Sequence, residues 1–290
     1  GKNERVKTLL EVNEEMLKEE LNVPDTVVMI QCVGSREPDH QYCSRICCAG
    51  AVKNAIAMKE RKPDARIFVL YRDMRTYGFR EEYYTKAREM GIMFIRYDLE
   101  SKPVVTETKS GLQVSVYDNI LDAELDIETD LLVLSARIDA NADNPELCKF
   151  YKVPLTADKF FLEAHVKLRP VDFASEGVFV CGFAHYPKDV DESISQAMAA
   201  SGRALTVLSK DTVEAGGKTA YINPARCNAC GACVTVCPYN AIEIDEEKEV
   251  AVVNEVLCKG CGACVSTCKG SAPNLKGFKD EQILHMINVV

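Results

Sequence analysis

The sequence has no apolar run long enough to cross a bilayer. A span needs about 18 residues, whereas strand-like runs such as GVFVCGF are far shorter. The first ten residues, GKNERVKTLL, lack the apolar core of a secretory signal. A formal net charge of −9 without a basic cluster argues against a nucleic-acid partner. These absences favour a cytoplasmic globular protein that is not inserted in a membrane.

A glycine-rich phosphate loop is also missing. No G-x-G-x-x-G motif occurs anywhere in the chain, and that motif is typical of dinucleotide sites in parallel α/β domains. The first predicted strand-to-helix turn instead lies in QCVGSREPDHQYCSRICCAG, which contains Cys32, Cys43, Cys47 and Cys48. We therefore expect that NAD(P)H does not bind at this turn.

Cysteine is the residue type that stands out. The chain contains 14 cysteines, of which eight fall between Cys227 and Cys268 and four between Cys32 and Cys48. A cytosolic chain keeps its thiols reduced, so grouped cysteines indicate metal binding or redox chemistry rather than structural disulfides. Cys148 and Cys181 stand alone, and we expect both in the hydrophobic core.

The first part of the chain alternates helices and strands. The predicted order is helix 5–20, strand 25–34, a helix capped by Ser44 and running to about Arg61, strand 65–73, helix 79–91 and strand 92–98. This spacing predicts a parallel βαβαβ unit with right-handed crossovers. The fold class is therefore α/β in this region.

The rest of the chain divides into three kinds of segment. Alternating residues in 103–130 predict antiparallel strands, and DLLVLSARI at 130–138 predicts a buried strand. A strand, a loop and a helix of small residues are expected within 176–205, followed by a linker at 211–219. The predicted domains are 1–23, an N-terminal helix and linker; 24–130, the βαβ unit; 131–215; and 216–290, a cysteine-rich domain.

The last domain contains an internal repeat. CNACGACVTVCP and CKGCGACVSTCKG each have the spacing C-x2-C-x2-C-x3-C, the pattern of bacterial 2[4Fe–4S] ferredoxins, in which the fourth cysteine of each run ligates the other cluster. One predicted cluster is held by Cys227, Cys230, Cys233 and Cys268, and the other by Cys258, Cys261, Cys264 and Cys237. Lys269 replaces the proline that follows the first run. Structural zinc is the alternative.

Several longer motifs resemble a known family. VVMIQCVGSRE, YCSRICCAGAVKNA, YRDMRTYG and GFAHYPKDVDESISQAMAASGRA, with the closing ferredoxin repeat, resemble the C-terminal portion of the A subunit of heterodisulfide reductase, an iron–sulfur flavoprotein. The implied fold is a Rossmann-like, thioredoxin reductase-type domain that is incomplete at its N-terminus. Residues 24–130 would match its nicotinamide domain and 131–215 the C-terminal part of its FAD domain. The C-x-x-C of true thioredoxin reductases is missing, so dithiol exchange is not expected.

The resemblance implies a third [4Fe–4S] cluster beside the flavin. Its ligands would be Cys32, Cys43, Cys47 and Cys48. Cys43 and Cys47 lie four positions apart, so they can face one way across a helix start, where the helix dipole favours thiolates. Two alternatives remain: all four are buried core cysteines, or either Cys47 or Cys48 does not bind iron directly.

The resemblance also suggests flavin contacts. Lys53 would approach the isoalloxazine ring, although a solvated helix lysine is an equal alternative. The candidates in the later segment are Gly182, Lys188, Asp189, Ser193 and Gln196. Phe183 stands where relatives of the thioredoxin reductase group have an aspartate. His185 is expected to be a loop histidine without a catalytic duty. Arg72, Arg75 and Tyr77 follow a predicted strand, at the carboxyl end where ligands of α/β proteins bind, and surface ion pairing would explain them equally well.

The implied activity is electron transfer through FAD within a heterodisulfide reductase complex. The FAD would be shared with an N-terminal complement, and the complex is expected to be dimeric. A hydrogenase or formate dehydrogenase would supply electrons through a small iron–sulfur protein. The electrons would be bifurcated to CoM-S-S-CoB reduction, on another subunit, and to ferredoxin. Two alternatives are a non-bifurcating subunit linked to a membrane quinone module and an iron–sulfur adaptor without flavin chemistry.

Overall fold

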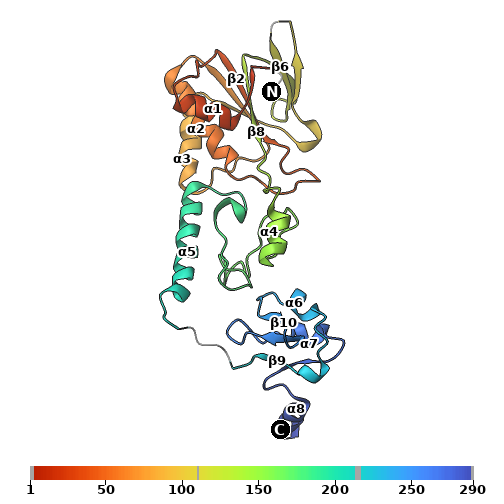
Figure 1. Ribbon diagram of the computed structural model, residues 1–290. Helices are drawn as coiled ribbons and strands as arrows, with labels where there is room; N and C mark the ends of the chain where they lie inside the picture. Colours follow the sequence, from red (N-terminus) through yellow and green to blue (C-terminus); the bar gives the residue numbers. More distant parts are fainter. Residues whose placement is uncertain (1–2, 110, 213–216, 289–290) are drawn as a thin grey trace. The chain divides into compact units, whose positions relative to one another are not determined.

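The structure, a computed structural model, describes residues 3–109, 111–212 and 217–288 (Figure 1). The chain forms two compact units. The first contains the residues up to Asp139 together with Pro187–Asp189, and the second contains Ala140–Tyr186 and the residues from Val190 onward. The four-part division made from the sequence stays a prediction.

A five-stranded parallel sheet forms the centre of the first unit. Its strands, in spatial order, are β1 (Val6–Thr8), β8 (Leu131–Ala136), β2 (Thr26–Val33), β3 (Arg66–Tyr71) and β4 (Met93–Arg96). The first six residues of β2 are all buried, as expected for a parallel strand covered on both faces. The predicted βαβαβ unit is thus confirmed, with α2 (Cys47–Arg61) and α3 (Glu81–Glu89) between its strands.

The two faces of this sheet are covered differently. Val27 and Met29 point into a core shared with helices α1 (Leu9–Leu17), α2 and α3. Val28 and Ile30 point into a second core, which includes residues of the antiparallel strands β6 and β7. That three-stranded sheet comprises β5 (Val104–Glu107), β6 (Leu112–Asp118) and β7 (Ala123–Thr129), and it confirms the predicted antiparallel segment. Short 3-10 turns occur at Gly78–Arg80 and Leu99–Ser101.

Three local predictions are wrong. Residues 5–20 are not one helix, because β1 precedes α1 and pairs with β8, and Thr8 then forms a capping box with Glu11. Ser44 does not cap α2: Ile46 is the N-cap, and the Ser44 hydroxyl accepts a hydrogen bond from the Ile138 amide instead. Around Val178 there is an isolated bridge, Asp172 to Phe179, rather than a strand.

The second unit combines an irregular segment with the cysteine-rich repeat. The first part contains α4 (Asn144–Tyr151), a 3-10 turn at Gly182–Ala184 and the predicted helix α5 (Val190–Leu208). The repeat contains β9 (Ala220–Ile222), a 3-10 turn at Pro224–Arg226, α6 (Ala232–Val236), β10 (Ile242–Asp245), β11 (Val250–Val253), α7 (Ala263–Thr267), β12 (Pro273–Leu275) and α8 (Asp280–Asn288). Part of the predicted linker 211–219 lies outside the described residues.

The repeat folds as two interlocked halves. β9 pairs antiparallel with β12, whereas β10 pairs antiparallel with β11, so each half contributes one strand to each two-stranded sheet. Helices α6 and α7 contact each other in this arrangement.

Among the helices that the structure describes, none combines the length and the apolar character needed to cross a membrane.

The buried centre of the parallel sheet yields a stability prediction. Met29 on β2 is 0% exposed, whereas Met93 on the edge strand β4 is 38% exposed. We expect Met29→Ala to lower the free energy of unfolding by about 2–5 kcal/mol, because it removes a buried side chain and leaves a cavity. Met93→Ala should cost about 0.5 kcal/mol. Urea unfolding followed by far-UV circular dichroism measures both, and equal losses would contradict the assignment of this core.

Candidate metal centres

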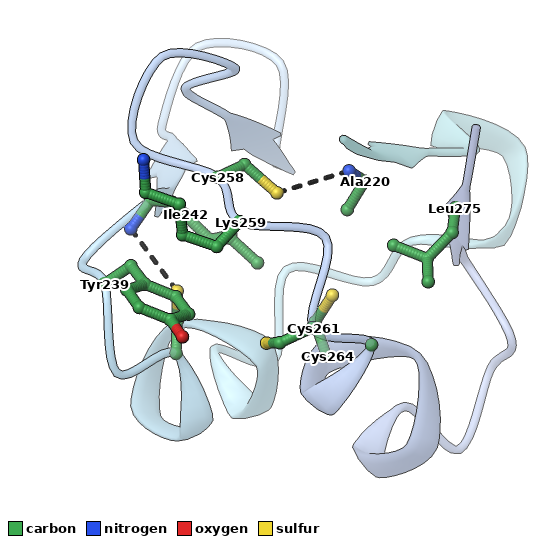
Figure 2. Close-up of a pocket in the computed structure, with 11 residues that line it drawn as sticks. Ala220, Tyr239, Ile242, Cys258, Lys259, Cys261, Cys264 and Leu275 are labelled. Carbon is green, nitrogen blue, oxygen red and sulfur yellow. Dashed lines mark hydrogen bonds between the residues drawn. The ribbon is translucent and has the colours of Figure 1, made fainter. Parts of the chain in front are cut away.

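Two cavities in the repeat are each lined by four cysteines. The lining of one includes Cys227, Cys230, Cys233 and Cys268. The lining of the other includes Cys237, Cys258, Cys261 and Cys264. Figure 2 shows Cys258, Cys261 and Cys264 arranged around the second cavity. The structure therefore brings the cysteines together in the two sets that the spacing predicts, with the fourth cysteine of each run in the cavity of the other run.

Glycines place the cysteine loops. Gly231 and Gly262 precede α6 and α7 with φ of 76° and 79°, a left-handed conformation that glycine adopts without steric cost. At Gly260 a Cβ atom would lie 2.1 Å from the Lys218 carbonyl oxygen. A side chain at this position would push the loop away from Lys218. Backbone geometry thus favours glycine at these three positions.

Backbone amides donate hydrogen bonds to the cysteine sulfurs in a reciprocal pattern. The Ala251 amide, in the second half, donates to Cys227 Sγ at 3.3 Å. The Ala220 amide, in the first half, donates to Cys258 Sγ at 3.3 Å (Figure 2). Such bonds stabilise negative charge on sulfur and are among the factors that set the reduction potential of an iron–sulfur cluster. Each half of the repeat therefore supports a ligand of the other half.

Burial opposes ionisation of two of these cysteines. Desolvation, followed by the neighbouring cysteines, raises the pKa of Cys264 to about 11. Desolvation also raises the pKa of Cys233. Metal binding requires the thiolate form, so the positive charge of a bound metal centre would have to offset this cost of ionisation. Cavities in which cysteines lie among apolar residues are therefore suited to a positively charged iron centre that stabilises thiolates.

The spacing of the thiols bears on the kind of metal centre. Within residues 3–109, 111–212 and 217–288, no three His, Cys, Asp or Glu side chains are placed to hold one metal ion. A cubane cluster binds its four thiolates at four separate corners, so its ligands need not converge on one point. The two cavities fit this wider arrangement, and the ligand sets stay a prediction.

The other four cysteines meet at the end of β2. The register of β2 against β8 shifts between Ile30 and Val33, and Cys32 at this irregularity has a left-handed backbone with φ of 61°. Irregularities of this kind redirect a side chain. Cys43 lies in the following loop, while Cys47 and Cys48 open α2. Cys43 is therefore not on the helix, and the expected helical spacing of Cys43 and Cys47 is wrong.

The pKa values of this group show that its thiols interact. Desolvation raises the pKa of Cys47 to about 12, with further increases from Cys48, Cys43 and Cys32 in that order. Desolvation likewise raises the pKa of Cys48 to about 11. The pKa of Cys32 is also raised by desolvation, with Arg36 opposing. All four thiols thus lie within mutual electrostatic range.

Arg36 provides a direct test of whether a charged group fits here. One terminal nitrogen donates to Asp73 Oδ2 at 2.5 Å. The other, Nη1, is buried and has no hydrogen-bond partner in the described structure. A buried guanidinium donor without an acceptor is costly, and the anionic sulfur of a cluster beside Cys32 would be a suitable acceptor. The group of four cysteines therefore fits an iron–sulfur cluster.

The segment YRDMRTYG, residues 71–78, encloses the cysteine loop. Arg72 Nη1 donates to the Arg36 carbonyl at 2.7 Å, and the Tyr77 hydroxyl accepts from Arg45 at 2.7 Å. The Cys48 thiol lies 3.7 Å from the Asp73 carbonyl. From the sequence, this segment was expected either on the ligand-binding side of the sheet or in surface ion pairs. The segment follows strand β3, which is the neighbour of β2 in the sheet, so its contact with the loop after β2 could have been predicted from this position.

The predicted flavin residues fall into separate groups. Lys53 is exposed on α2, and its ammonium group donates to Asn13 of α1, a placement that also suits the alternative of a solvated lysine. Lys188 is buried, and Asp189 pairs with Arg80 at 2.7 Å, both within the first unit. Ser193 is half-buried near the start of α5. Their roles stay predictions.

Gly182 and Gln196, also predicted, are brought together. The Gly182 amide donates to Gln196 Oε1 at 2.9 Å, and Gln196 Nε2 lies 2.7 Å from His185 Nδ1. His185 is 7% exposed, and its Nε2 lies 2.7 Å from Glu163 Oε2. This histidine is thus part of a buried network, which its sequence context did not indicate. Cys148 and Cys181 are half-buried rather than in the core, so that expectation is wrong.

The exchanged fourth cysteines yield a prediction. Cys268→Ser should remove or alter the cluster in the cavity that also contains Cys227, although Cys268 belongs to the other run. Cys237→Ser is the matched variant for the second cavity. Electron paramagnetic resonance of each reduced variant, compared with Cys230→Ser and Cys261→Ser, measures the outcome. If Cys268→Ser altered the same signal as Cys261→Ser, the exchange would be wrong.

Comparison with known proteins extends these findings. The family described as 4Fe-4S dicluster domain matches residues 198–241 and 226–272. This match confirms the ferredoxin part of the predicted fold. The five-stranded parallel sheet confirms the α/β part. Thioredoxin reductase of T. acidophilum aligns with a TM-score of 0.45 and 15% identity over 72% of this chain and 58% of that chain. L-lysine 6-monooxygenase of Pseudomonas syringae aligns with a TM-score of 0.42 and 11% identity over 71% and 58%. Neither likeness carries information on ligands.

Sequence relatives are closer. The iron-sulfur A subunit of CoB–CoM heterodisulfide reductase from Methanocaldococcus jannaschii is 41% identical over 92% of this chain and 41% of its own length. The A subunit of the H2/formate:CoB-CoM heterodisulfide,ferredoxin reductase from Methanococcus maripaludis is 40% identical over 91% and 41%. This chain therefore spans about two fifths of the length of these relatives. Over nine-tenths of its length it is homologous to a part of the heterodisulfide reductase A subunit, and the resemblance seen in its motifs is confirmed.

Proposed function

We propose that this chain is the electron-transferring, iron–sulfur portion of a heterodisulfide reductase-type flavoprotein. The observation that carries the proposal is the sorting of eight cysteines into two cavities, each lined by cysteines from both runs. The four cysteines beside the unpartnered Arg36 nitrogen support a third centre. The chain would thus be an oxidoreductase component, whose iron–sulfur clusters accept and release single electrons when bound.

The residues of the chain prepare these sites. Amides of Ala220, Ala241 and Ala251 donate to sulfur, which stabilises thiolates and favours the reduced state of a bound centre. Arg36 is half-buried and supplies a positive charge next to Cys32. Apolar side chains such as Ile242 and Leu275 line the second cavity (Figure 2) and limit the access of water to it. No protein side chain is assigned a catalytic role in this scheme, and the disulfide chemistry is placed on another subunit.

An FAD shared with an N-terminal complement belongs to the same proposal. Helix α5 exposes Val190, Ile194, Met198, Leu205 and Leu208 on one side. Apolar residues exposed along one helix face mark a surface that another protein segment covers. Since the relatives extend well beyond this chain, the complement is the natural occupant, and the flavin would bind where it meets this chain.

The partners are proposed from the names of relatives. The relative from Methanococcus maripaludis is named for hydrogen or formate, heterodisulfide and ferredoxin, which supports a complex with a hydrogenase or formate dehydrogenase and its small iron–sulfur subunit. Bifurcation from FAD to CoM-S-S-CoB reduction and to ferredoxin, a dimeric complex and a cytoplasmic location complete the proposal. Co-purification with a membrane cytochrome would favour the non-bifurcating, quinone-linked alternative. A native complex without flavin would favour the adaptor.

The number of irons tests the cluster proposal. The chain assembled under anaerobic conditions should contain about twelve irons and as many sulfides, from three clusters of four irons. Cys32→Ser should lower the count by about four because that thiol belongs to the third site, whereas Cys148→Ser, which changes an isolated cysteine, should leave it unchanged. Iron and sulfide analysis measures the outcome. A count of about eight in the unaltered chain would contradict the third site.

Flavin binding tests the shared site. The isolated chain should retain little FAD on gel filtration, and addition of the N-terminal complement should restore binding. Met198→Lys should weaken binding of the complement because it places a charge on the exposed apolar face of α5. Ala199→Lys, on the opposite side of the helix, is the control. Stoichiometric FAD retained by this chain alone would refute the shared site.

A further inference from the structure

Lys152 connects α4 to the ferredoxin repeat within the second unit. It ends α4 in a left-handed conformation, with φ of 52° and ψ of 45°, and its side chain is half-buried. Its ammonium group donates to the Val234 carbonyl at 3.0 Å and to the Cys237 carbonyl at 3.3 Å. These carbonyls lie at the C-terminal end of α6, and Cys237 lines the second cavity. A lysine from outside the repeat thus places a positive charge at the backbone of a cysteine of that cavity.

Neighbouring residues hold this lysine in position. The Ser175 hydroxyl, on a residue that is 5% exposed, lies 2.5 Å from the Pro238 carbonyl and 3.3 Å from the Lys152 carbonyl. Next to it, Glu176 pairs with Lys259 at 2.7 Å. Contacts to both cysteine runs therefore come from the same short loop. The arrangement fixes the Lys152 charge relative to the second cavity.

The two cavities differ in charge. Lys259 lines the second cavity (Figure 2), whereas Asn228, its counterpart in the repeat, lines the first. Val265 and Cys268 are the counterparts of Val234 and Cys237, and in the described part of the chain their carbonyls accept no side-chain hydrogen bond. Glu176 offsets the charge of Lys259.

The first cavity has two cations of its own nearby, since Arg226 and Lys269 adjoin Cys227 and Cys268 where the second run has Leu257 and the first has Pro238. Both are exposed, whereas Lys152 is half-buried and bonded to carbonyls of the cysteine run itself. Lys152 is therefore the cation that we expect to act most strongly on one cavity alone.

We propose that Lys152, assisted by Lys259, makes the cluster in the second cavity the better electron acceptor of the two. The inference rests on the proposed function, because it requires a cluster in each cavity. Reduction adds one negative charge, and a nearby cation stabilises that charge most strongly where water is excluded. With a cluster bound in each cavity, one electron would pass from the first cluster, which would be oxidised, to the second, which would be reduced, without breaking a bond or moving a proton. Electrons in the repeat would thus collect beside α4.

Charge-changing variants of the full 290-residue chain, loaded anaerobically with iron and sulfide, test this proposal. Lys152→Met removes the charge and keeps most of the side-chain length, whereas Lys152→Arg keeps the charge. Lys149→Met removes the same charge from an exposed position on the same helix. Potentiometric titration followed by electron paramagnetic resonance reads each cluster separately, and the signals are assigned by their loss in Cys261→Ser and Cys230→Ser.

We expect Lys152→Met to lower the potential of the Cys261-dependent cluster alone. The shift should change the electron distribution between the clusters about tenfold, which is about 59 mV for one electron. Lys152→Arg and Lys149→Met should change the potential of this cluster by only a small fraction of that amount. An unchanged potential in Lys152→Met, or an equal shift of both clusters, would overturn the proposal. Loss of iron in both Lys152→Met and Lys152→Arg would show a structural role and would overturn it as well.

A second variant tests the asymmetry without altering Lys152. Asn228→Lys places in the first cavity the cation that Lys259 provides in the second, and it should raise the potential of the Cys230-dependent cluster. A potential that does not rise would count against electrostatic control. The iron content of the unaltered chain separates the two levels of inference: without about eight irons in the repeat, from two clusters of four, the proposed function fails. With that iron present and no shift in Lys152→Met, only the present proposal fails.

Discussion

The burial of several thiols close together is the constraint on which the structure depends. Desolvation and neighbouring sulfurs raise the pKa of Cys47 to about 12 and those of Cys48 and Cys264 to about 11. Burial thus disfavours the thiolate form of these groups, and four thiolates at one site would repel one another. Iron would supply the missing positive charge, so cluster binding and the stability of these loops would be coupled. The predicted metal sites are therefore local arrangements that iron would complete.

The backbone solves the same problem in two different ways. In the repeat, left-handed glycines and a two-residue spacing bring three cysteines to one cavity, and the opposite half supplies the fourth. At the end of β2, an irregular strand register and a left-handed Cys32 redirect one thiol toward two others at the start of α2. A left-handed cysteine is conformationally unfavourable. The sheet, the Arg36–Asp73 pair and the segment 71–78 hold it there.

Sequence reasoning succeeded where one spacing has one geometric meaning. The repeated C-x2-C-x2-C-x3-C pattern led to the correct grouping of cysteines in space, and apolar runs located the parallel strands. It failed where the outcome depends on a distant partner. Val6–Thr8 forms a strand because it pairs with the edge of β8. The Ser44 hydroxyl accepts a hydrogen bond from the Ile138 amide and therefore does not cap α2. The contacts of Lys152 and His185 join residues far apart in the chain, so no local pattern could reveal them.

The turn after β2 occupies the position at which parallel α/β domains with a dinucleotide site have their phosphate-binding loop. A phosphate-binding turn needs amides that point outward and are free. Here the Ser35 amide donates to the Cys32 carbonyl at 3.1 Å, the Arg36 amide to the Tyr42 carbonyl at 3.2 Å and the Glu37 amide to the His40 carbonyl at 3.0 Å. The turn thus uses its donors to fold the cysteine loop. These three amides are therefore not free to bind a phosphate group.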